Sequence, residues 1–180
     1  MPAMSRDWDT GRLRPERPRV PEMIGGYVAG PVVIWRSDEV MLSLRQVLAY
    51  PTGLEIDVEV QARGFPLGGA KPFGGSGEHK QLVFRLQLPD GTYLVQDDDA
   101  GSLDGGGPAL TQSFEWTSNG LTGRESARVG LWLWPLPPPG PLNMTFSWRR
   151  RSLEDVGFTL DGDAIRDAAE RALPFWSGAS

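Results

Sequence analysis

Hydrophobic and polar residues alternate along several short stretches of the chain. In the clearest of them, LEIDVEVQ (residues 54–61), every second residue is aliphatic and the residues between are acidic or polar. This period of two is typical of a β-strand with one buried face and one solvated, acidic face. The segment before it, EVMLSLRQVLAY, alternates in the same way, but its phase slips at Arg45–Gln46. Such a slip predicts a β-bulge.

Similar alternation recurs at short intervals along most of the chain. Turn sequences separate these stretches, for example Pro51-Thr52-Gly53, Pro89-Asp90-Gly91 and Asn119-Gly120. About eight short strands at this spacing, with connections too short for helical crossovers, predict an all-β fold: an antiparallel β-sandwich. Both an immunoglobulin-like and a jelly-roll-like topology fit the pattern, and alternation does not choose between them.

The period changes near the C-terminus, where apolar residues recur at helical spacing from Ile165 to Leu173. This spacing predicts one α-helix over about 163–173, capped by Asp161 or Asp163 and ended by Pro174. At the other end, residues 1–22 show no period and hold many Arg and Pro residues. We therefore expect a flexible N-terminal arm and a single β-sandwich domain over 23–180.

Composition fits this layout and excludes several classes of function. The chain has 180 residues, of which 23 are Gly and 16 are Pro, as expected for many short elements joined by turns. The net charge of -5 argues against nucleic-acid binding, which needs a basic stripe. The absence of cysteine excludes thiolate chemistry and Cys-ligated metal centres. With no apolar membrane span and no apolar signal segment, we expect a cytoplasmic protein that does not bind membranes.

The stretch VGLWLWPLPPPGPLNMTFSW, residues 129–148, concentrates aromatic residues and prolines. By its period, Trp148 shares the inner face of its strand with other apolar residues, so it is expected in the core. Trp132 and Trp134 fall on the opposite face, which is otherwise polar, and they therefore need a cover. Pro137 and Pro138 lie in the stiff, extended connection that follows and belong to the same candidate surface.

Two interpretations of Trp132 and Trp134 stay open. In the first, the C-terminal helix lies over them together with Phe175 and Trp176, because its apolar stripe must pack on something. In the second, they form an exposed apolar patch for a protein partner, a second copy of the chain, or a flat ligand such as a sugar ring.

Candidate chemistry elsewhere is sparse. His79 is the only histidine, and no orienting partner can be named for it, so no catalytic triad is predicted. The loop DDDAGSLDGGG, residues 97–107, is a candidate Ca²⁺ site through Asp97, Asp99 and Asp104, although its spacing is not that of an EF-hand. No other metal and no cofactor is predicted.

The acidic face of residues 54–61 offers a second kind of chemistry. Alternate residues of a strand lie about 6.5–7 Å apart, which is within the range that paired carboxylates use in glycoside hydrolysis. The carboxylates concerned are Glu55, Asp57 and Glu59. A regular acidic ladder is nevertheless the normal solvated side of a sheet.

Parts of the chain resemble a family of small uncharacterised proteins common in actinobacteria. The segments that carry the resemblance are PLPPPGPL, MTFSW and FTLDGDAIRDAAERALPFW, together with EVMLSLRQVLAYPTGLEIDVEV. The resemblance implies an all-β body with a terminal helix. It brings no activity, so it assigns no functional residue.

From these patterns we expect a non-catalytic protein-interaction or assembly module. Its partner is another protein or a second copy, bound through Trp132, Trp134, Pro137 and Pro138. The alternative is a carbohydrate- or small-ligand-binding β-sandwich that stacks its ligand on the two tryptophans. A carboxylate-dependent hydrolase is the third hypothesis.

Overall fold

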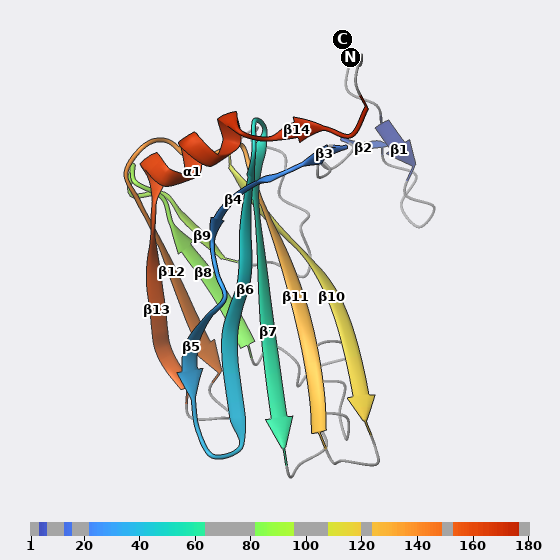
Figure 1. The fold of residues 1–180 in the computed structure, drawn as a ribbon, viewed down its shortest axis with the longest axis vertical. Coiled ribbons are helices and arrows are strands. Elements are labelled where there is room, and N and C mark those ends of the chain that lie inside the picture. Colours follow the sequence, from blue (N-terminus) through green and yellow to red (C-terminus); the bar gives the residue numbers. More distant parts are fainter. Residues whose placement is uncertain are drawn as a thin grey trace.

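The computed structural model describes residues 4–6, 13–15, 22–63, 82–95, 108–119, 124–148 and 153–176. Within these ranges the chain is an all-β, antiparallel, sandwich-like fold with one C-terminal helix, as the alternation predicts (Figure 1). A six-stranded and a four-stranded sheet form the body, and two two-stranded ribbons accompany them.

The larger sheet has the strand order β10–β11–β7–β6–β4, and β5 also pairs with β6. Four of these strands are long: β6 (Val40–Tyr50), β7 (Gly53–Arg63), β10 (Ala109–Asn119) and β11 (Arg124–Trp134). The other two are short and share the outer edge of β6: β4 (Gly26–Ala29) and β5 (Val32–Arg36).

The smaller sheet has the order β13–β12–β8–β9. Its strands are β8 (Leu82–Gln87), β9 (Tyr93–Val95), β12 (Pro141–Trp148) and β13 (Leu153–Asp161). Each of the two ribbons is an antiparallel pair: β1 (Met4–Arg6) with β2 (Leu13–Pro15), and β3 (Met23–Ile24) with β14 (Leu173–Pro174). The β3–β14 ribbon therefore joins segments from opposite ends of the sequence.

The inner faces of the two sheets form one hydrophobic core. The aliphatic residues of the 54–61 stretch are completely buried on β7, and the inner residues of β12, Trp148 included, are buried opposite them. The predicted bulge is also confirmed, because the register between β6 and β7 shifts between Leu44 and Gln46. The bulge restores the inner face, so that Val47 is buried as Leu44 is.

The helix α1 (Gly162–Glu170) lies at one end of the sandwich and packs on β4, β6 and β13 (Figure 1). The Asp161 carboxylate caps it by accepting a 3.0 Å hydrogen bond from the Asp163 N–H. Ile165 belongs to the hydrophobic core. The helix ends earlier than the sequence predicts, because the chain leaves it after Glu170 to pair with β3. Leu173 is therefore a strand residue and not part of the helical stripe.

Candidate functional site

Trp132 lies on the outer face of the larger sheet, where it pairs in register with Glu55. Only 6% of its surface is exposed. The ring meets Tyr50 edge-on, with ring centroids 5.7 Å apart and planes at 68°. A Cβ atom built on Gly53 would lie 2.6 Å from Cζ2 of Trp132, so the indole lies directly over this glycine. Tyr50 on β6 and Gly53 on β7, both strands of the same sheet, thus contribute to the cover of Trp132.

This arrangement bears on both interpretations of the tryptophan face. The main contacts of the helix are with β4, β6 and β13, and Phe175 and Trp176 remain more than half exposed. Trp132 is also not an open patch. Alternation assigns a side chain to a face of the sheet, but it does not show whether the side chain stands up from that face or lies flat on glycine neighbours.

The other residues expected at this surface also offer limited area. Trp134 is half-buried, opposite Ala109 on β10. Pro137 is buried, and its carbonyl accepts a 3.2 Å hydrogen bond from Nη2 of Arg166 on α1. Pro138 is half-buried. The proline-rich connection therefore ties the end of β11 to the helix.

Tyr50 links the aromatic pair to the acidic ladder. Its hydroxyl donates a 2.9 Å hydrogen bond to Oε2 of Glu55. Burial raises the pKa of Tyr50 above its ordinary value of 10.0, and the hydrogen bond and the charge of Glu55 raise it further. The ring also lies over Gly25, where a Cβ atom would come within 2.7 Å of Cζ. Tyr50 is consequently a structural part of this face.

The carboxylates of the ladder are half-buried, which is less open than the predicted solvated face. Glu59 forms an ion pair with Arg45, with Nε and Oε2 3.7 Å apart. Burial raises the pKa of Asp57, while Arg45 and Arg128 act in the opposite direction. Glu55 accepts the hydrogen bond from Tyr50 described above. Each of the three carboxylates therefore has a cationic or hydroxyl neighbour of its own. This is the environment of a structural polar face.

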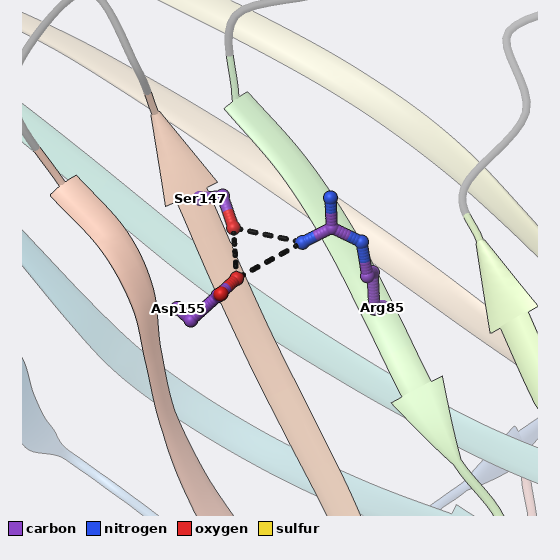
Figure 2. Close-up of polar contacts among 3 residues, drawn as sticks. All are labelled: Arg85, Ser147 and Asp155. Atoms are coloured by element: carbon purple, nitrogen blue, oxygen red, sulfur yellow. Dashed lines mark hydrogen bonds and ion pairs between the residues drawn. The ribbon is translucent and has the colours of Figure 1, made fainter.

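A second polar cluster, which no pattern in the sequence predicts, spans three strands of the smaller sheet. Figure 2 shows Arg85 from β8, Ser147 from β12 and Asp155 from β13. The Ser147 hydroxyl donates to Oδ1 of Asp155 at 2.7 Å, and Nη1 of Arg85 donates to the same hydroxyl at 2.8 Å. Arg85 also forms an ion pair with Asp155 at 3.2 Å.

This cluster sits at an irregularity of the sheet. The β12–β13 register shifts between Phe146 and Trp148, and Asp155 has a positive φ of 47°. The Ser147 hydroxyl is nearly buried and is used both as donor and as acceptor, so we assign the cluster to holding the bulge. Only the strand register brings the three residues together, and no sequence motif could have found them.

Among the described residues, four exposed apolar side chains lie on the β3–β14 ribbon or directly after it, beside α1 (Figure 1). Leu173 pairs with Ile24, and the Phe175 N–H donates to the Glu22 carbonyl at 3.4 Å. The large apolar side chains here are exposed to 58% at Ile24, 59% at Leu173, 52% at Phe175 and 71% at Trp176. We call these four residues the terminal patch.

Three residues of the terminal patch are expected from the sequence in other roles. Helical spacing places Leu173 on the helix, and Phe175 and Trp176 are expected with the helix over β11. The pairing of Leu173 with Ile24 is non-local, so helical spacing alone could not reveal it. The available signal was Pro174, which ends the helix and leaves two aromatic residues beyond it.

Other expected sites lie outside the described residues: the calcium candidates Asp97, Asp99 and Asp104, and His79. Within the described ranges, no three His, Asp or Glu side chains gather closely enough to hold a metal ion. No helix in that part of the chain is long and apolar enough to cross a membrane. No protein-family model matches the chain, and no curated protein matches its sequence.

Proposed function

We propose that this protein is a non-catalytic protein-interaction or assembly module, and that it binds its partner through the terminal patch. The observation that carries the proposal is the exposure of Ile24, Leu173, Phe175 and Trp176 on one short ribbon. From their exposed fractions, these side chains present roughly 500 Å² of apolar surface. Large exposed apolar side chains close to one another on a protein surface commonly mark a binding site.

The proposed binding surface is the terminal patch and not the tryptophan face of β11. Trp132 and Pro137 are buried, so they cannot supply the main contact area without rearrangement. The terminal patch, in contrast, already presents Trp176 and Phe175 to solvent. Aromatic side chains of this kind supply much of the binding energy at protein interfaces.

The two alternatives draw less support from the described residues. Stacking of a sugar ring on Trp132 needs an open indole face, yet this indole lies on Gly53 and against Tyr50. Hydrolysis by the acidic ladder needs two carboxylates free to act as acid and base, whereas Glu55 binds Tyr50 and Glu59 pairs with Arg45.

The proposal is tested by comparing two sets of surface substitutions in the full chain. The triple variant Leu173→Ser/Phe175→Ser/Trp176→Ser removes most of the terminal patch. The control is Tyr93→Ser/Val95→Ser, which removes exposed apolar side chains from β9, at the edge of the smaller sheet. Each protein is immobilised, and the proteins that it retains from an extract of its native cells are compared.

We expect the wild type and the β9 control to retain the same partner, and the patch variant to lose it. Circular dichroism and thermal unfolding should show that both variants stay folded, because exposed side chains contribute little to stability. Equal retention by both variants contradicts the proposal.

A further inference from the structure

We propose that the occupant of the terminal patch is the same patch of a second copy of this chain, related by a two-fold axis that passes between Ile24 and Leu173. This inference rests on the proposed function, because it names the partner of the surface assigned there. The area of the patch and the charges at its two ends support it.

The area is sufficient for a weak, specific dimer. The patch offers roughly 500 Å² of apolar surface on each copy, so a dimer that covers both patches buries on the order of 1,000 Å², the lower limit for a specific protein interface. The largest contributor is Trp176, at 71% exposure. An interface of this size is expected to exchange with monomer at micromolar concentrations.

The charges at the ends of the ribbon are opposite in sign. Glu22 is exposed beside Phe175, at one end of the row. Arg171 is exposed at the other end, where its guanidinium donates a 3.3 Å hydrogen bond to the Tyr27 carbonyl. Arg171 ends the helix before β14 and Glu22 bonds to Phe175 after it, so the two charges lie at opposite ends of the ribbon.

A two-fold axis at the centre of the row exchanges its two ends. It therefore places Glu22 of each copy near Arg171 of the other, while Leu173 and Ile24 face their own copies across the axis. A self-complementary arrangement of this kind is what an interface between identical subunits requires. Two identical ion pairs would then flank the apolar centre and fix its register.

Sedimentation velocity of the full chain over a concentration range from about 5 µM to about 500 µM tests the proposal, since a small interface is populated only at such concentrations. The variants are Glu22→Arg, Arg171→Glu and the combined charge exchange. We expect the wild-type mass to rise from 19.7 kDa towards twice that value. Each single exchange should weaken the dimer about tenfold, because it sets like charges against each other twice, and the combined exchange should restore it.

Two further variants make the result specific. Leu173→Glu places two carboxylates next to the axis and should abolish the dimer, whereas Tyr93→Glu, at an equally exposed position on β9, should leave it intact. Thermal unfolding of each variant shows that the fold is retained.

Three outcomes would overturn the inference: a mass of 19.7 kDa at every concentration, a dimer that survives Leu173→Glu, or a combined exchange no tighter than its single variants. A mass of 19.7 kDa at every concentration does not overturn the proposed function, because a monomer can still bind a different protein through the patch. The retention experiment then decides whether it does. If the retention experiment also fails, the proposed function fails with it.

Discussion

The indole of Trp132 lies on Gly53, a residue of the neighbouring strand: a Cβ atom at position 53 would be 2.6 Å from Cζ2 of the ring and 2.5 Å from the Leu133 carbonyl oxygen. Because glycine has no side chain, the indole ring can lie against the backbone at this position. This relationship removes part of a large aromatic side chain on the outer face of the sheet from solvent.

Gly53→Ala is therefore expected to destabilise the fold. The added methyl group meets backbone as well as the ring, so the two strands must separate or the indole must lift, at a cost of about 1–3 kcal/mol. Chemical denaturation followed by circular dichroism measures the loss. Thr52→Ala, at the exposed neighbouring turn position, is the matched control and should change the free energy of unfolding by less than about 0.5 kcal/mol. Equal effects at the two positions would contradict this packing.

Substitution of Trp132 should act on stability. Trp132→Ala leaves a cavity under Tyr50 and should lower the free energy of unfolding by about 3–5 kcal/mol. Trp132→Phe should cost markedly less, because the indole N–H is buried without a hydrogen-bond partner among the described residues and its removal relieves that burial. Trp176→Ala, at an exposed position, should be nearly neutral. A neutral Trp132→Ala would show that the ring is not packed as described.

The raised pKa of Tyr50 predicts a specific loss of folding stability at alkaline pH. Its pKa is raised in the folded state, so the neutral hydroxyl is favoured there, and this contribution is complete below the unfolded pKa of about 10. It is lost as pH rises above that value, because the unfolded chain then releases the proton more readily. Urea unfolding from about pH 8 to about pH 11 should show a steeper decline for the wild type than for Tyr50→Phe. Tyr93→Phe, at an exposed position, should behave as the wild type does.

The polar cluster of the smaller sheet should contribute to stability through Ser147. Ser147→Ala removes the donor to Asp155 and the acceptor for Arg85, and should lower the free energy of unfolding by about 1–2 kcal/mol. A double-mutant cycle with Arg85→Ala measures the coupling. The effects of the two substitutions should be less than additive, because each breaks the same network. Strict additivity would mean that the cluster does not act as a unit.

The elements that the sequence predicts well are those whose signal is local. Alternation on β7 identifies its buried face, the phase slip near Arg45 locates the bulge, and Asp161 marks the start of the helix. Each of these features depends on neighbouring residues in the chain. A single sequence therefore contains the information that they need.

The candidate site depends instead on contacts between distant segments. Leu173 joins Ile24 because the two chain ends meet in one ribbon, and helical spacing continues past Glu170 without revealing it. The indole of Trp132 lies over Gly53, a diagonal neighbour on β7, and not over its register partner Glu55. Strand order and register decide both cases, and a pattern of hydrophobic and polar residues does not specify them.

The most direct test of the terminal patch as a self-association surface uses the absence of cysteine from the chain. Leu173→Cys places a single thiol next to the proposed two-fold axis, where the thiols of two copies come within disulfide distance. Mild oxidation followed by non-reducing electrophoresis should convert this variant to a covalent dimer much faster than Tyr93→Cys, whose exposed thiol lies on β9. Equal rates for the two variants would show that the patches do not face each other, and would contradict the account.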